Sequence, residues 1–283
     1  MVSSDPLVAS FCAHYRESNA DALVVRPCRE LLARAPTERF ATPLEVLASC
    51  QGIRTIECGS LLTPSILFEH DGGFRIVLNE ADPPERRRFS LAHEIVHTFF
   101  RSVTGYGLAH DSTEVERLCD VGAAELTMPD GRFPAILQAS GLTIAGLRAC
   151  SQEFATSLQA SARRAIEITA QPAAVLIADA EVADDHHIPD ASELRVASIY
   201  RSSTWVAADD PLLLDIARLA PAQQAFVNLD DRIGNIASPD SARRGMVVVE
   251  AAGYKFDLAG RRTRRVVVLL VPPELQGPEQ LPG

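Results

Sequence analysis

The sequence predicts an α+β protein, and three observations support this fold class. Residues 6–170 carry mostly helical patterns around one strand and a hairpin, whereas short β-type segments dominate from about residue 171 onward. Of the 283 residues, 47% are hydrophobic and 23% are charged, which is typical of a globular chain with a packed core. The length suffices for one large or two ordinary domains, and the change of pattern favours more than one.

The N-terminal part is expected to begin with helices and to continue into strands. Residues 6–35 have apolar positions at helical spacing, and residues 42–52 form a short helix for which Thr42 is the predicted N-cap. Residues 53–58 and 65–80 have the pattern of strands, and an Asp-Gly-Gly sequence inside the second stretch predicts a hairpin turn.

Two longer helices follow, and then the pattern changes. We expect helices over residues 87–102 and 113–128, and two or three short helices over residues 131–170. Beyond them, Gly, Pro and Asp separate β-rich segments at residues 173–179, 193–201, 246–260 and 264–273. This change places the main domain boundary near residues 171–174.

The composition argues against several classes of protein. A formal net charge of −10 disfavours a domain whose whole surface binds nucleic acid. Six cysteines without a C-x-x-C pair indicate reduced thiols rather than a disulfide framework. No apolar run is long enough to cross a bilayer, and the N-terminus lacks the pattern of an export signal. We therefore expect a cytoplasmic protein with no membrane partner.

The helix over residues 87–102 contains the sequence His-Glu-Ile-Val-His. His93 and His97 are four residues apart and so share one helix face, where both imidazoles can bind one metal ion. Glu94 follows the first histidine directly, which places its carboxylate beside the ion as a general base for a bound water. Two exposed or hydrogen-bonded histidines on an ordinary helix are the alternative interpretation, because so short a motif also arises by chance.

A catalytic zinc needs a third protein ligand and one open position. The next helix offers Glu114 and Glu116, and Glu116 is the better candidate because Asp120 follows it one turn later. The carboxylate of Asp120 can orient a histidine ligand by accepting its second N–H. The same acidic residues would also suit an ordinary solvated helix face. Taken together, the two helices favour a zinc site.

These two helices resemble the ImmA/IrrE family of metallopeptidases. The stretches ERRRFSLAHEIVH and EVERLCDVGAAELTMP are similar to the two family motifs, and the likeness covers residues 42–130 closely and residues 131–170 loosely. The resemblance implies a zincin-like fold, zinc ligands at the two histidines and Glu116, and Glu94 as the catalytic base. Many members carry Asn where this chain has Asp120, a departure that keeps the orienting role.

The second helix is closer to the IrrE branch of this family, which implies three parts. Residues 1–130 would form the zinc metallopeptidase domain. Residues 131–172 would form a helical, helix-turn-helix-like segment, and residues 173–283 a β-rich, GAF-like sensor domain. The metal would be zinc, with manganese as the alternative.

The resemblance also implies a function. Members of the family cleave a helix-turn-helix repressor and so release a DNA-damage, mobile-element or antiphage operon. We therefore expect a regulatory endopeptidase whose substrate is such a repressor and whose activating signal is DNA damage or single-stranded DNA.

Three further residues are candidates for roles near the metal. Tyr106 and His110 lie in the polar link between the two helices, where either side chain could stabilise the oxyanion of a tetrahedral intermediate, although both also suit an ordinary surface loop. Cys58 could occupy the open metal position as an inhibitory thiolate, although a free cysteine is more often a small buried residue. Cys119 is expected to face the core.

A cluster of arginines near the C-terminal end is a candidate nucleic-acid contact. It comprises Arg261, Arg262, Arg264 and Arg265, and nearby aromatic residues could stack on bases. A solvated turn between two strands is the alternative interpretation.

Two other functions stay open on the sequence alone. The chain could be a DNA- or ligand-binding regulatory module with a structural metal site, although a structural zinc is closed by four protein ligands and no fourth is obvious. It could also be a non-specific degradative metallopeptidase, which would cleave unrelated unfolded proteins such as casein.

Overall fold

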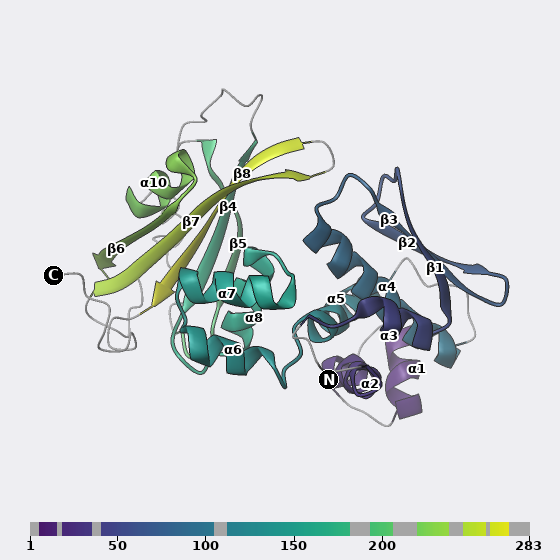
Figure 1. Ribbon diagram of the computed structural model, residues 1–283. Coiled ribbons are helices and arrows are strands. Elements are labelled where there is room, and N and C mark those ends of the chain that lie inside the picture. Colours follow the sequence, from purple (N-terminus) through teal and green to yellow (C-terminus); the bar gives the residue numbers. More distant parts are fainter. Residues whose placement is uncertain are drawn as a thin grey trace. The chain divides into compact units, whose positions relative to one another are not determined.

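A computed structural model describes residues 6–15, 19–35, 41–104, 112–181, 193–205, 220–237, 246–258 and 261–271 (Figure 1). The chain divides into two compact units. The first contains residues 1–133 together with 152–156, and the second contains residues 134–151 together with 157–283. Each unit has its own hydrophobic core.

Helices make up most of the first unit. They are α1 (Pro6–Tyr15), α2 (Ala20–Leu32), α3 (Leu44–Cys50), α4 (Pro84–Thr104) and α5 (Thr113–Thr127). The single helical region expected near the N-terminus is therefore two helices, and α2 begins where the side chain of Asn19 accepts the backbone N–H of Asp21. The longer pair, α4 and α5, pack against each other in the middle of this core.

One small sheet completes the first unit. Its strands β1 (Ile53–Gly59), β2 (Ser65–His70) and β3 (Gly73–Asn79) have the order β1-β3-β2. The predicted hairpin of β2 and β3 is confirmed, and its turn has positive φ at Asp71 (50°) and Gly72 (71°). Strand β1 pairs with β3 in parallel.

The predicted N-cap of α3 is wrong. Pro43 occupies the cap position without a side-chain hydrogen bond. Thr42 is buried, its carbonyl oxygen accepts from Arg88 Nη2, and its hydroxyl accepts from Arg132 Nη2 at 3.1 Å. Two arginines that are distant in sequence thus bind the polar groups of Thr42 that were expected to cap the helix.

The second unit combines helices with a five-stranded sheet. The helices are α6 (Phe133–Ser140), α7 (Ile144–Phe154), α8 (Leu158–Ile168) and α10 (Ala220–Asn228), although Phe133 of α6 and residues 152–154 of α7 belong to the first unit. The strands β4 (Ala174–Glu181), β5 (Arg195–Arg201), β6 (Asp231–Ala237), β7 (Met246–Leu258) and β8 (Arg261–Val271) have the order β5-β4-β8-β7-β6, antiparallel throughout. Helix α8 packs on β4 and β5, and α10 packs on β6, β7 and β8.

The compact units divide the chain differently from the change in sequence pattern. The main boundary was expected near residues 171–174, whereas the units separate at residues 133–134, so most of the helical segment belongs with the second sheet. The α+β class is confirmed by the two sheets and the helices around them.

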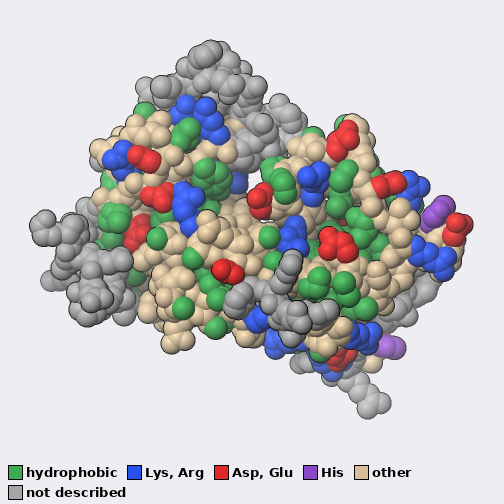
Figure 2. Space-filling model, viewed as in Figure 1, with side chains coloured by type: hydrophobic (Ala, Val, Ile, Leu, Met, Phe, Trp, Pro, Cys, Tyr) green, Lys and Arg blue, Asp and Glu red, His purple; other side chains and the backbone are tan. Residues whose placement is uncertain are grey.

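Two surface properties bear on function. On the face shown in Figure 2, acidic and basic side chains alternate with hydrophobic ones over each unit, so the acidic excess of the sequence is not gathered into one patch there. None of the described helices is both long enough and apolar enough to cross a membrane.

Candidate metal centre

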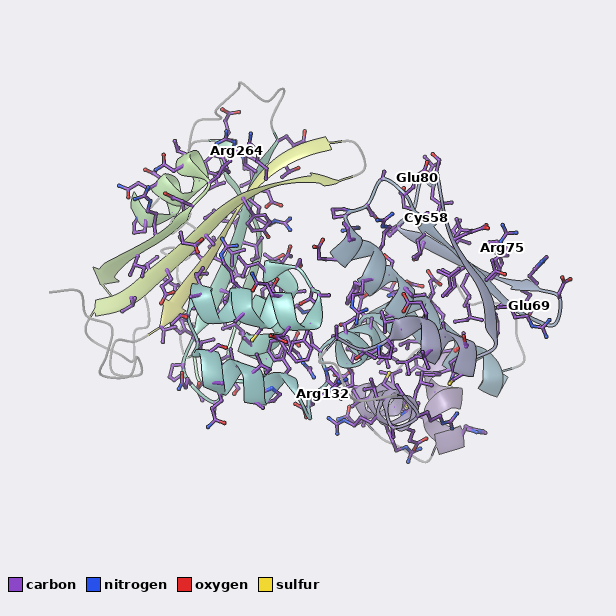
Figure 3. The ribbon with its side chains drawn as sticks, viewed as in Figure 1. Cys58, Glu69, Arg75, Glu80, Arg132 and Arg264 are labelled. Carbon is purple, nitrogen blue, oxygen red and sulfur yellow. The ribbon has the colours of Figure 1, made fainter. Side chains whose placement is uncertain are left out.

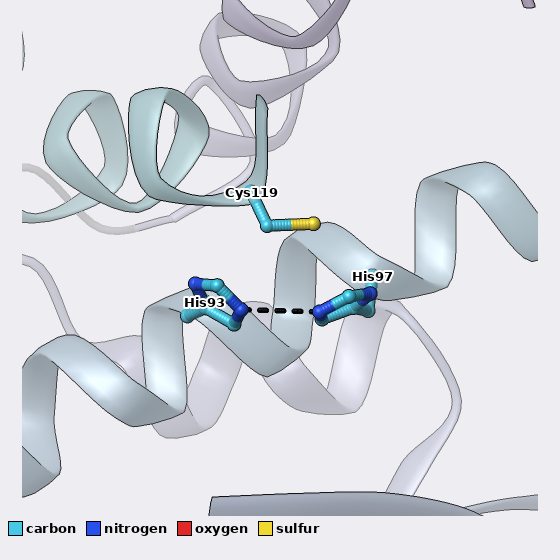
Figure 4. A group of neighbouring side chains, drawn as sticks. All are labelled: His93, His97 and Cys119. Atoms are coloured by element: carbon cyan, nitrogen blue, oxygen red, sulfur yellow. Dashed lines mark hydrogen bonds between the residues drawn. The ribbon is translucent and has the colours of Figure 1, made fainter. Parts of the chain in front are cut away.

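Helix α4 places two imidazoles side by side. His93 and His97 are one turn apart, their Nε2 atoms lie 3.1 Å from each other, and their ring centroids are 4.8 Å apart (Figure 4). His97 is buried, and the His93 side chain is only 15% exposed. Because α4 lies in the core of its unit, its polar face is held in place by the apolar packing around it.

Helix α5 brings a carboxylate to the same point. Glu116 Oε2 lies 3.1 Å from His93 Nε2, and Glu116 Oε1 lies 3.3 Å from His97 Nε2. Glu114, the alternative in the sequence, instead accepts two hydrogen bonds from Arg117, at 2.9 and 3.0 Å. Of these two glutamates, Glu116 is therefore the one that contacts both histidines.

Asp120 occupies the orienting position. His93 Nδ1 lies 2.9 Å from Asp120 Oδ1, so this nitrogen donates to the carboxylate and Nε2 points at Glu116 and His97. Burial lowers the pKa of His93, but hydrogen bonds to Asp120 and Glu116 outweigh it and raise the pKa to about 9. Hydrogen bonds from the two histidines hold the pKa of Glu116 well below its usual range. The site thus favours positive charge between these groups.

The donor set fits a zinc ion. Two nitrogen or oxygen donors at 2.0–2.1 Å from a tetrahedral zinc are about 3.3 Å apart. The two ring nitrogens are 3.1 Å apart, Glu116 Oε2 lies 3.1 Å from that of His93, and Glu116 Oε1 lies 3.3 Å from that of His97. Imidazole and carboxylate are also ligand types that zinc accepts in catalytic sites.

Glu94 lies beside this group and is 5% exposed. The hydroxyl of Ser65, the first residue of β2, donates to Glu94 Oε1 at 2.7 Å. Within the described part of the chain, the buried Oε2 atom has no hydrogen-bond partner. A carboxylate with one oxygen held and the other free is suited to taking up a proton at a defined atom.

Ser65 was missed by the sequence analysis. Nothing in the sequence around a serine at the start of a strand indicates contact with a helix 29 residues later. The contact arises because β2 lies against α4, which is a property of the tertiary fold.

The two cysteines considered in the sequence have different surroundings. Cys119 is fully buried, as expected, and its Sγ lies in one group with ring nitrogens of His93 and His97, all within 4.8 Å of one another. Cys58 is exposed on β1, and its Sγ accepts from Arg87 Nη1 at 3.7 Å (Figure 3). Among the described residues, Cys119 rather than Cys58 is the thiol grouped with the histidines.

Two arginines of the predicted nucleic-acid cluster make internal contacts instead. Arg264 is 4% exposed, and its Nη1 donates to the backbone carbonyls of Phe226 (3.3 Å) and Val227 (3.0 Å) near the end of α10 (Figure 3). Arg265 donates twice to Asp179, both at 2.6 Å, and also to Gln159. Arg264 is therefore buried, and Arg265, whose side chain is 16% exposed, is paired with Asp179, whereas the prediction placed both on a surface that contacts nucleic acid.

Other predicted site residues lie outside the described residues. Tyr106 and His110 fall in residues 105–111, and the side chains of Arg261 and Arg262 are likewise outside them. Their roles stay predictions.

The chain is similar to known proteins in sequence and in fold. A family model described as Peptidase_M78, IrrE N-terminal-like domain, matches residues 48–166. The radiation response metalloprotease IrrE of Deinococcus deserti is 30% identical over 193 residues, which are 60% of this chain and 69% of that protein. A solved structure described as a Mycobacterium tuberculosis transcriptional regulator aligns with a TM-score of 0.55 and 13% identity, over 94% of this chain and 79% of that one. The last likeness concerns the fold.

Proposed function

The chain belongs to the family of IrrE-like metallopeptidases, and from this premise we propose that it is a zinc-dependent regulatory endopeptidase. The observation that carries the proposal is the convergence of His93, His97 and Glu116 at 3.1–3.3 Å, next to a buried glutamate. When bound, zinc supplies Lewis-acid activation of a peptide carbonyl and of water. The remaining tasks fall to side chains of the chain itself.

Glu94 is proposed to move the proton. The hydroxyl of Ser65 engages Oε1, which leaves Oε2 to accept a proton from the attacking water. The same oxygen can then deliver that proton to the leaving nitrogen of the cleaved peptide bond. Because Glu94 is buried, bulk water does not compete for this oxygen.

We propose a helix-turn-helix transcriptional repressor as the substrate, a single cut in which would derepress a stress or antiphage operon. Membership of the IrrE-like family supports a regulatory substrate of this kind. The likeness of the fold to a structure described as a transcriptional regulator is compatible with it.

The second unit is proposed to sense the signal. The five-stranded antiparallel sheet, with helix α10 packed on it, supports a GAF-like identity for residues 173–283. DNA damage, relayed as single-stranded DNA, is the proposed signal. The internal contacts of Arg264 and Arg265 mean that any DNA contact has to use other residues.

The first test is cleavage by the full-length protein of a helix-turn-helix protein encoded beside its gene. With zinc we expect one defined cut, and Glu94→Gln should slow it by about 10²–10⁴-fold while zinc stays bound. Glu114→Gln is the matched control, because that carboxylate is paired with Arg117 instead of facing the histidines. An active Glu94→Gln protein would rule out the proposed base.

Two further cleavage measurements distinguish a regulatory peptidase from the alternative functions. Casein should be spared, since a degradative peptidase would cut it and a regulatory one should not. Single-stranded DNA should accelerate the cut if it is the signal. Zinc binding without cleavage of either protein, with or without DNA, would favour a binding module with a structural metal.

A further inference from the structure

A thiol shares the position at which the two histidines converge. Cys119 lies on α5 one turn after Glu116 and is fully buried. Its Sγ and ring nitrogens of His93 and His97 lie within 4.8 Å of one another, and in Figure 4 the sulfur lies above the gap between the two rings. We propose that Cys119 binds the same metal ion directly, as a fourth protein ligand beside His93, His97 and Glu116. This inference rests on the proposed function.

The geometry requires only a small adjustment. A nitrogen at 2.0–2.1 Å and a sulfur at 2.3 Å from a tetrahedral zinc are about 3.5 Å apart. The observed separations are all within 4.8 Å, so the longest of them has to shorten by about 1.3 Å at most. Both helices already fix the backbone at the required spacing, because Glu116 on the same helix reaches both histidines.

The surroundings of Cys119 are those of a ligand. Most buried cysteines act as small apolar residues. The other buried thiol nearby, Cys28 on α2, fits that description and donates to the backbone carbonyl of Gly122 at 3.5 Å. Cys119 instead lies beside two imidazoles, at a site where the carboxylates of Glu116 and Asp120 contact His93. A divalent cation would offset these negative charges, and the thiol proton would pass to solvent as the sulfur–metal bond forms.

A thiolate ligand has two consequences. It favours zinc over manganese, because soft sulfur donors select zinc whereas carboxylates also suit manganese. It also closes the coordination sphere, since two imidazoles, one carboxylate and one thiolate make four ligands and leave no open position. The resting enzyme is then latent, and it becomes active when Cys119 leaves the ion.

X-ray absorption of the zinc-loaded full-length protein tests the bond without any substitution. We expect one sulfur at about 2.3 Å among the nearest neighbours of the metal. A shell of nitrogen and oxygen alone would overturn the inference. This measurement stands even if variants at this buried position fold poorly.

Cobalt substitution assigns the sulfur to a residue. The cobalt-loaded protein should show a thiolate-to-metal charge-transfer band in the near ultraviolet, which Cys119→Ser should abolish. The matched control is Cys28→Ser, which changes the neighbouring buried thiol and should keep the band. A band that persists in Cys119→Ser contradicts the proposal.

Metal affinity and cleavage complete the test. Cys119→Ala should weaken zinc binding by at least the roughly 10–100-fold seen when outer-shell partners are lost, and manganese binding should change less. The same variant should cleave its substrate faster than the wild type when saturated with zinc. Unchanged affinity would overturn the inference.

Different results would contradict the proposed function and the proposed role of Cys119. If zinc binding does not depend on His93 and His97, the proposed function as a zinc peptidase is contradicted. If zinc binding depends on both histidines but the bound zinc has no sulfur neighbour, only the proposed role of Cys119 is contradicted.

Discussion

At the scale of single residues, the two ring nitrogens of His93 have different partners and different roles. One ring nitrogen donates to Asp120 at 2.9 Å, and the other faces Glu116 and His97. The first contact fixes the orientation of the ring, and the second makes its lone pair available to a metal once the proton on that nitrogen has left. Asp120 would therefore influence a bound metal through the orientation of His93.

We predict that Asp120→Leu weakens zinc binding by about 10–100-fold, the usual cost of losing an outer-shell partner of a histidine ligand. Asp120→Asn should retain most of the affinity, because its amide oxygen can accept the same N–H. Competition titration with a zinc chelator measures both variants. Equal losses in the two would show that charge, and not the hydrogen bond from His93, is what matters.

The sequence predicted the residues that depend on spacing along one helix, and it missed those that depend on contacts between elements. The four-residue spacing of His93 and His97 and the choice of Glu116 agree with the geometry. Ser65 could not be found, because its contact with Glu94 depends on where β2 lies. Arg264 was assigned to the surface because charge runs usually are, yet its guanidinium is buried against the end of α10.

At the scale of elements, the close approach of α4 and α5 holds the site together. Gly122 on α5 faces Val96 on α4, and a Cβ at position 122 would lie 2.7 and 2.9 Å from the two methyl groups of Val96. Val96 is buried and β-branched, so its side chain has essentially one rotamer in a helix and cannot move aside. Only glycine therefore permits this helix spacing.

We predict that Gly122→Ala destabilises the protein by about 1–2 kcal/mol, because overpacking outweighs the gain of about 1 kcal/mol in helix propensity. Zinc affinity should fall with it, because α5 carries Glu116. Gly131→Ala is the control, since nothing lies within 4 Å of its added Cβ, and it should be neutral within about 0.5 kcal/mol. Urea denaturation measures both. If space is the cause, Val96→Ala should cost less in the Gly122→Ala background than alone.

Elements were predictable where a local signal exists. The Asp71-Gly72 turn specified the β2–β3 hairpin because both positions need positive φ. The parallel pairing of β1 with β3 has no such signal, because the two strands are separated in the chain by β2. Thr42 failed as a cap since Arg88 and Arg132, far along the chain, bind its polar groups.

At the scale of the whole molecule, the chain passes between its two compact units more than once. After residue 133 it enters the second unit, returns for residues 152–156, and leaves again. Phe133 and Phe154 are both fully buried, and their rings pack at a centroid distance of 5.3 Å within the first unit. A sequence pattern that changes near residue 171 cannot reveal this return, because residues 152–156 lie inside residues 131–170, where the sequence predicts only short helices.

We predict that Phe154→Ala lowers the free energy of unfolding of the first unit by about 3–5 kcal/mol, the usual cost of removing a buried phenylalanine. Hydrogen exchange should therefore accelerate in α4 and α5 of that unit and change little in β4 and β8 of the second. Val227→Ala, at a position 41% exposed, is the control and should leave both units unchanged. Faster exchange confined to β4 and β8 would show that Phe154 supports the second unit instead. A peptidase fragment ending at residue 130 lacks both aromatic residues, and for the same reason it should be less stable than one that extends through residue 156.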